Sequence, residues 1–250
     1  YWKWTLGTNE LETKPTYHPM KEQIYSDLST SVKEELISDV PISVFLSGGI
    51  DSSIIAALAV ENSKYNVDTF TVGFKDKTLD ESNPANTIAK KLGTKHKLIS
   101  FESEDLNGLT QRAFKNLDIP LGDSSYIPTF LLCEKVSQSY KCAISGDGGD
   151  ELFGGYPTYR AHKLLSFYES YVPQKMRGYL MHKILKLLPN SDKNISPQMK
   201  LSRFLAGKTL PLVKRHFTWM STSYDKEIIN KLMSNRVISK IDKSRSGNTI

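Results

Sequence analysis

The chain contains 250 residues, of which 39% are hydrophobic and 24% charged, a composition that suits a soluble globular protein of one large or two small domains. No apolar run approaches the length of a membrane span and no signal peptide is visible, so we expect no contact with a membrane. Neither Cys133 nor Cys142 belongs to a Cys-x-x-Cys pair or a disulfide framework, which indicates a reducing, cytoplasmic setting. Cys142 is expected to be a buried thiol, and Cys133 to lie on a helix.

The net charge of +6 is unevenly distributed along the chain. Residues 1–150 carry 15 basic and 21 acidic side chains, a net charge of −6, whereas residues 151–250 carry 18 and 6, a net charge of +12. A basic half can indicate nucleic-acid binding or a set of solvated helix faces. The basic residues are scattered and no nucleic-acid motif accompanies them, so we predict solvated helix faces and no nucleic-acid partner.

The predicted elements follow a regular order. Residues 1–20 look irregular, and Lys21–Asp39 then has the pattern of an amphipathic helix whose buried stripe is Ile24, Leu28, Val32 and Leu36. Four strands and four helices come next, the strands at Val40–Leu46, Asp68–Phe74, Lys95–Phe101 and Lys141–Ser145, and the helices at Ser52–Glu61, Glu81–Leu92, Glu104–Asn116 and Ser124–Tyr140. The alternation predicts an α/β fold, a parallel sheet with helices on both faces.

Strand patterns fade after Gly155, and a mostly helical C-terminal part is expected. Its predicted helices are Leu164–Tyr171, Lys175–Leu188, Ser202–Leu205 and Asp225–Met233, and prolines, including Pro211, separate them. Ligands of parallel α/β sheets bind at the carboxyl ends of the strands. Ser47 and Ser145 both follow such ends, which directs attention to the two segments that they begin.

The first segment is Ser47-Gly48-Gly49-Ile50-Asp51-Ser52-Ser53, a glycine turn that opens an apolar helix. Helix starts have unpaired amides and a partial positive charge, and glycines let the backbone approach an anion closely, so the pattern predicts a phosphate site. Asp51 would repel a bare phosphate, which suggests a bridging Mg²⁺. No Lys follows the glycines, so this is not a Walker P-loop; the alternative is an ordinary glycine-rich turn.

The second segment, residues 145–156, reads Ser-Gly-Asp-Gly-Gly-Asp-Glu-Leu-Phe-Gly-Gly-Tyr. Its five glycines indicate a backbone folded tightly around a ligand. The carboxylates of Asp147, Asp150 and Glu151 point to a metal or a cationic partner, although Asp150 and Glu151 would also suit a helix start. An EF-hand is excluded because the twelfth loop position would be Thr158 in place of Glu.

Together the two segments resemble the synthetase domain of glutamine-dependent asparagine synthetases, which belong to the ATP pyrophosphatase (PP-loop) superfamily. Val72-Gly73-Phe74, Asp80-Glu81-Ser82 and residues 122–129 also look like that family. The resemblance is strong from about Trp2 to Arg160 and implies an adenine nucleotide alpha hydrolase-like, Rossmann-like fold. It further implies a ligase that uses ATP and Mg²⁺ to adenylate the side-chain carboxylate of aspartate, after which ammonia displaces AMP and asparagine forms.

The resemblance also assigns roles to individual residues. Those expected to contact ATP are Leu46, Ser47, Gly48, Gly49, Asp51, Ser52, Ser53, Val72, Ser145 and Gly146. Asp51 and Asp150 would hold Mg²⁺. The expected catalytic residues are Asp147, Ser47 and Asp51, and Asp147 stands where many members of the family have the longer Glu.

The domain organisation follows from the same resemblance. Residues 1–20 would be a linker from a glutaminase domain that precedes Tyr1, residues 21–160 the ATP pyrophosphatase domain, and residues 161–250 a truncated helical extension. The expected partners are aspartate, ammonia from the glutaminase domain, and a second copy of the full-length protein. Residues 240–245 resemble the family's Lys-x-Asp-Arg segment only loosely and its Glu-x-Arg-x-Pro stretch does not occur, so the isolated chain is expected to bind ATP but to turn over poorly.

Four alternatives stay open. The enzyme could amidate another carboxylate, on a sugar or an antibiotic precursor; it could be another PP-loop ligase, such as an NAD or GMP synthetase, although their second motifs differ from residues 145–156. The chain could also be a non-catalytic ATP-binding module or a nucleic-acid binder.

The histidines of the chain have no metal-ligand spacing and are expected at the surface or in packing: His18, His96, His162, His182 and His216. No Gly-x-Ser-x-Gly elbow indicates a serine hydrolase.

Overall fold

The computed structural model describes residues 17–101, 105–119, 121–171, 201, 204, 210–220 and 234. The chain forms two compact units, Tyr1–Phe153 and Gly154–Ile250. The predicted helices Lys175–Leu188 and Asp225–Met233, all of Ser202–Leu205 except Phe204, and residues 240–245 lie outside the described residues. Among the helices that are described, none combines the length and the hydrophobicity that a bilayer crossing requires.

The first unit is built on a parallel sheet in the order β3-β2-β1-β4. Its strands are β1 (Ile42–Phe45), β2 (Asp68–Gly73), β3 (Lys95–Ser100) and β4 (Cys142–Ile144). In the register, Val44 of β1 stands opposite Thr69 of β2 and Ile144 of β4. The α/β fold with a parallel sheet is therefore confirmed.

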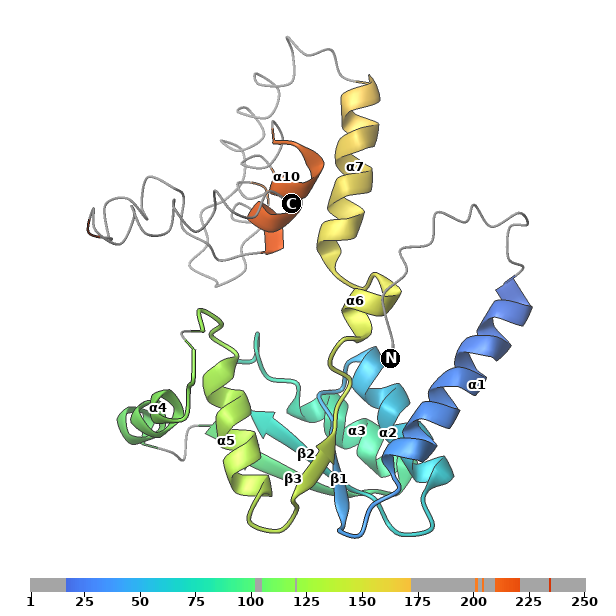
Figure 1. Cartoon of the computed structure of the whole chain (residues 1–250), viewed down its shortest axis with the longest axis vertical. Helices are drawn as coiled ribbons and strands as arrows, with labels where there is room; N and C mark the ends of the chain where they lie inside the picture. The colour runs from blue at the N-terminus through green and yellow to red at the C-terminus, as the bar shows by residue number, and fades with distance from the viewer. Residues whose placement is uncertain are drawn as a thin grey trace. The chain divides into compact units, whose positions relative to one another are not determined.

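Helices cover both faces of this sheet (Figure 1). The helices α1 (Tyr17–Glu35), α2 (Ile50–Asn62) and α3 (Ser82–Leu92) pack together on one face, and α5 (Tyr126–Val136) lies across the other with α4 (Leu106–Lys115) against it. Right-handed crossovers explain the division. The chain steps from β1 to β2 to β3 in one direction and then returns past β1 to β4, so the later helices lie on the opposite face.

The core of the unit lies between β1 and the first three helices. Val44 and Leu46 are fully buried there, and α1 contributes Val32 to the same cluster. Small side chains on α2 and α3 allow these helices to approach each other and the sheet closely, namely Ala56, Ala59, Ala85 and Ala89. This packing fixes the start of α2 relative to the end of β1.

Several element boundaries differ from the sequence prediction. Helix α1 begins at Tyr17 and not at Lys21, because Pro19 lies in the first turn, where its missing N–H costs no hydrogen bond. Ile24 of its predicted buried stripe is 37% exposed, whereas Leu28 and Leu36 pack against the core.

The prediction for Cys142 was wrong, since Cys142 is exposed on β4, which has one described neighbouring strand. Cys133 lies on α5, as predicted.

The second unit contains α7 (Pro157–Tyr171) and α10 (Leu212–Met220). Helix α7 includes the predicted Leu164–Tyr171 and begins earlier, at Pro157, whereas α10 is not among the predicted helices, since Pro211 suggests a break between helices. The structure shows Pro211 before the first turn, where its carbonyl accepts a hydrogen bond from the Arg215 amide at 2.8 Å. His162 of α7 stacks on His216 of α10 and packs against Trp219, and His162 Nε2 lies 3.2 Å from His216 Nδ1. These two histidines therefore serve in packing, as predicted.

One polar contact links β2 to the segment after α5. The Tyr140 hydroxyl donates to Asp68 Oδ2 at 2.6 Å, and its ring packs edge-on against Phe70. The hydrogen bond to the Asp68 carboxylate, helped by burial, raises the pKa of Tyr140 to about 12. The folded protein thus holds the hydroxyl proton more tightly than the unfolded chain does.

Tyr140→Phe is expected to lower the free energy of unfolding by about 1 kcal/mol at pH 7, since it removes this hydrogen bond. Because the pKa is raised on folding, the contribution is complete below pH 10 and is lost as the pH rises toward 12. Urea unfolding at pH 7 and at alkaline pH measures both effects. Tyr65→Phe, at a side chain that is 86% exposed, is the control, and equal losses in the two variants would contradict the prediction.

Candidate functional site

The two glycine segments leave neighbouring strands at the same edge of the sheet. The first loop, residues 47–49, joins β1 to α2, and the second loop, residues 145–148, joins β4 to the short helix α6 (Gly149–Phe153). Strands β1 and β4 are adjacent, and the strand order changes direction between them. Such a switch point is where open α/β sheets hold their ligands.

The first loop is held in shape by its own serines. Ser47 Oγ accepts a hydrogen bond from the Gly49 amide at 3.2 Å and lies 2.9 Å from Ser52 Oγ. The hydroxyls of Ser52 and Ser53 both donate to the Gly49 carbonyl. Gly48 has a φ of +88°, a conformation that favours glycine. These hydrogen bonds tie the loop to the first turn of α2.

The start of α2 has the features of an anion site. Gly49 is its N-cap residue and supplies no side chain to cap the helix. The amides of the first turn therefore receive no side-chain acceptor from the cap position, and the helix dipole adds partial positive charge there. This arrangement supports the sequence prediction of a phosphate site at the first loop.

The second loop touches the start of α2 directly. A Cβ atom at Gly146 would lie 2.6 Å from the Ser52 amide nitrogen, and one at Gly149 would lie 2.7 Å from Asp51 Cγ. The neighbours of Gly146 are backbone atoms, which cannot turn aside, so a side chain there would force the two segments apart, whereas Gly149 faces the side chain of Asp51. The structure thus brings together residues that are about a hundred positions apart in the sequence, and it places the half-buried Asp51 against the first residue of α6.

The start of α3 forms a third wall that the sequence analysis did not identify. A Cβ at Gly48 would lie 2.7 Å from Pro84 Cβ and 2.8 Å from the Ala85 amide nitrogen. The connection before α3 carries Asp80, whose carboxylate accepts a hydrogen bond from the Phe74 amide just beyond β2. Asp80 accepts from the amide two residues ahead of it, at Ser82, which is the pattern of an Asx turn before a helix, and this was the sequence feature that could have drawn attention to the start of α3.

The two residues expected to contact adenosine lie at the ends of β1 and β2. The Leu46 amide donates to the Phe70 carbonyl at 2.9 Å, and the Leu46 carbonyl accepts from the buried Thr71 hydroxyl. Val72 stands opposite Ile99 in the ladder between β2 and β3. Thr71 is therefore a supporting residue at the end of β1 that the sequence did not reveal.

The acidic residues of the second segment lie in two different elements, the loop and the helix α6. Asp147 is exposed, and its amide donates to Ser145 Oγ at 3.3 Å. Asp150 and Glu151 lie in the first turn of α6, so the alternative of a helix start holds for both. Within the described parts of the chain, no three His, Cys, Asp or Glu side chains cluster as a metal site. Magnesium binding by Asp51 and Asp150 stays a prediction, and it fits the way Mg²⁺ is held by one or two carboxylates with substrate phosphates.

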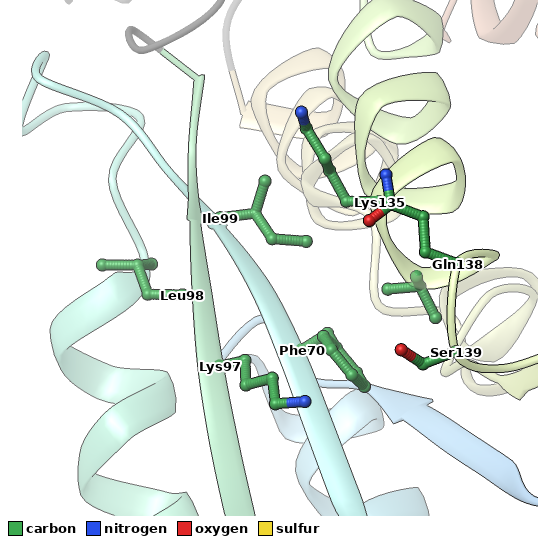
Figure 2. Close-up of a pocket in the computed structure, with 8 residues that line it drawn as sticks. Phe70, Lys97, Leu98, Ile99, Lys135, Gln138 and Ser139 are labelled. Carbon is green, nitrogen blue, oxygen red and sulfur yellow. The ribbon is translucent and has the colours of Figure 1, made fainter.

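A pocket of about 490 Å³ lies away from both loops, on the α5 face of the sheet (Figure 2). It is lined by Phe70, Lys97, Leu98, Ile99, Lys135, Val136, Gln138 and Ser139. Lys97 Nζ lies 4.0 Å from Asp68 Oδ2 and 5.4 Å from the centre of the Phe70 ring. Neither glycine loop contributes to this pocket, so it is separate from the candidate phosphate site.

The sequence of the chain is similar to those of known proteins over a region that includes both loops. The sequence profile of the Asparagine synthase family matches residues 23–240. A putative glutamine-hydrolysing asparagine synthetase of Mycobacterium tuberculosis is 34% identical over 175 residues, which are 70% of this chain and 26% of the relative. Asparagine synthetase 1 of Bacillus subtilis is 35% identical over 184 residues, 73% of this chain and 28% of that protein.

A putative asparagine synthetase of Methanocaldococcus jannaschii is 35% identical over 221 residues, 87% of this chain and 39% of the relative. The chain thus spans between about a quarter and two fifths of the length of these curated relatives. The matched region contains both glycine loops and all three walls of the site. The chain therefore belongs to the asparagine synthase family.

Proposed function

We propose that this chain is the ATP-using part of a glutamine-dependent asparagine synthetase. The observation that carries the proposal is the contact between the two glycine loops at the uncapped start of α2, where Gly146 lies against the backbone of Asp51 and Ser52. Membership of the asparagine synthase family supplies the class of reaction. The proposed substrates are ATP, aspartate and ammonia, and the ammonia comes from a glutaminase domain of the full-length protein.

The proposed reaction has two steps. An oxygen of the aspartate side-chain carboxylate attacks the α-phosphorus of ATP, and the bond to the β-phosphate oxygen breaks, which releases pyrophosphate and forms β-aspartyl-AMP. Ammonia then attacks the acyl carbon, AMP leaves, and a proton passes to solvent as the amide forms. Neither step needs a protein nucleophile, so the protein acts by positioning and by stabilising charge.

The proposal gives each loop residue a role. The amides at the start of α2 bind the pyrophosphate part of ATP, while the hydroxyl protons of Ser52 and Ser53 already point to the Gly49 carbonyl and brace the loop. Asp51 and Asp150 would hold Mg²⁺, which offsets the negative charge of the phosphates. Ser145 and Gly146 line the same corner, and Leu46 and Val72 contact adenosine through their backbones. Asp147 is the residue nearest in role to the family's Glu at that position.

The direct test is the exchange of labelled pyrophosphate into ATP by the full-length protein, with aspartate present or absent. We expect aspartate-dependent exchange and release of AMP. Exchange that requires another carboxylate would reassign the acceptor and keep the site, whereas binding of Mg-ATP without exchange on any carboxylate would indicate a non-catalytic module. Release of ADP would overturn the proposed cleavage between the α- and β-phosphates.

Asp51→Asn is expected to lower the exchange rate by about 10²-fold, because an amide would hold the proposed Mg²⁺ less tightly than a carboxylate and the charge of the departing pyrophosphate would be offset less well. The amide keeps the shape of the side chain against Gly149, so folding should be little changed. Asp118→Asn, at an exposed position outside both loops, serves as the matched control. A rate within twofold of the wild type in Asp51→Asn would remove Asp51 from the proposed site.

A further inference from the structure

The carboxylate of Asp80 joins the end of β2 to the start of α3. Its Oδ1 atom accepts hydrogen bonds from the Phe74 amide at 3.1 Å and from the Ser82 amide at 3.3 Å, and its Oδ2 atom accepts from the Ser82 hydroxyl at 2.7 Å. The Ser82 hydroxyl, followed by the Phe74 amide, lowers the pKa of Asp80. Asp80 is thus a carboxylate that accepts three hydrogen bonds, one from the residue that follows β2 and two from the first residue of α3.

Both of those elements form walls of the proposed nucleotide site. A Cβ at Gly73 would lie 3.6 Å from Asp80 Oδ1, so the end of β2, next to Val72, passes directly by the carboxylate. At the other side, α3 presents Pro84 and Ala85 to Gly48 of the first loop. Substitution of Asp80 would therefore displace segments on both the adenosine side and the phosphate side of the proposed site.

We propose that Asp80 is a positioning residue for nucleotide binding, and this inference rests on the proposed function. Asp80 holds the start of α3 at the distance from β2 at which Gly48 fits against Pro84. It acts through these segments and does not touch the nucleotide. A carboxylate suits the role because both of its oxygens accept, whereas the NH₂ group of an amide could not accept the proton that the Ser82 hydroxyl donates.

The same connection contains a matched control. Asp76 is exposed, and its Oδ1 accepts from the Thr78 amide at 2.9 Å and from the Thr78 hydroxyl at 2.7 Å. These bonds lower the pKa of Asp76 as well, but they stay within the turn. Asp76→Ala therefore removes a carboxylate with similar local hydrogen bonds, but these bonds do not connect Asp76 to β2 or to α3.

The test measures the dissociation constant of Mg-ATP and the KM for ATP and kcat of the exchange reaction in the full-length protein. We expect Asp80→Ala to raise the dissociation constant and the KM for ATP by about tenfold, with a smaller effect on kcat, because the loop is displaced while the reacting groups are kept. Asp80→Asn should give a smaller increase, since its oxygen can still accept from the two amides. Asp76→Ala should stay within twofold of the wild type.

The outcomes separate the two claims. If the wild type binds no Mg-ATP, the proposed function fails whatever Asp80 does. If the wild type binds and both Asp80 variants bind within twofold of it, the inference about Asp80 is wrong, even when their melting temperatures fall, since a purely structural role lowers stability without changing the affinity of the folded protein. If Asp80→Ala does not fold, the affinity of Asp80→Asn decides by the same criterion.

Discussion

Gly146→Ala is expected to weaken the binding of Mg-ATP by at least about tenfold, equivalent to about 1.4 kcal/mol. The new methyl group would lie 2.6 Å from the Ser52 amide nitrogen and 2.9 Å from the Asp51 carbonyl carbon, which are backbone atoms that cannot turn aside. The second loop must therefore move away from the start of α2, which opens the corner that the phosphates would occupy. Isothermal titration calorimetry with Mg-ATP on the full-length protein measures the loss.

Gly122→Ala provides the control for this variant. Gly122 is exposed, and a Cβ there would meet no atom within 4 Å, so the added methyl group is the same but the clash is absent. Its affinity for Mg-ATP should equal that of the wild type. If Gly146→Ala bound as tightly as Gly122→Ala, the two loops would not form one site.

Gly48→Ala is expected to lower the free energy of unfolding by about 3 kcal/mol and to weaken Mg-ATP binding as well. Two costs combine, namely the left-handed backbone at φ +88°, worth about 1–2 kcal/mol for a residue with a Cβ, and the overlap with Pro84, worth about 1–3 kcal/mol. Urea unfolding gives the change in stability, and calorimetry gives the change in affinity.

Gly93→Ala separates these two costs. Gly93 ends α3 with a φ of +70°, but a Cβ there would meet nothing within 4 Å. This variant should show the backbone cost alone, about 1–2 kcal/mol, with unchanged affinity for Mg-ATP. An equal loss of stability in the two variants would mean that α3 does not press on the first loop.

The parts of the fold that could be predicted are those in which local pattern and tertiary structure agree. Alternating apolar runs and helical repeats specify β1 to β4 and their helices, and a glycine turn after a strand identifies both loops. Gly93 and the first turn of α3 follow from helix-end chemistry in the same way. These features depend on residues close together in the sequence.

The missed features depend on neighbours that a single sequence does not reveal. Cys142 lies in an apolar run, but the exposure of β4 depends on its place in the sheet. The Thr71 hydroxyl matters because β1 and β2 are adjacent, and Pro84 matters because α3 begins beside Gly48. Helix α10 was missed because a proline can precede a helix as readily as end one. In each case the residue can be read from the sequence, but the neighbour that decides its role cannot.

The braced serines of the first loop have a thermodynamic consequence. Because Ser47, Ser52 and Ser53 hydrogen-bond to one another and to the Gly49 carbonyl, a polyphosphate at the proposed site would meet a loop whose hydroxyls already have partners. On the proposed function, the protein would then lose little conformational entropy on association, and most of the ordering cost would fall on the torsions of the incoming polyphosphate.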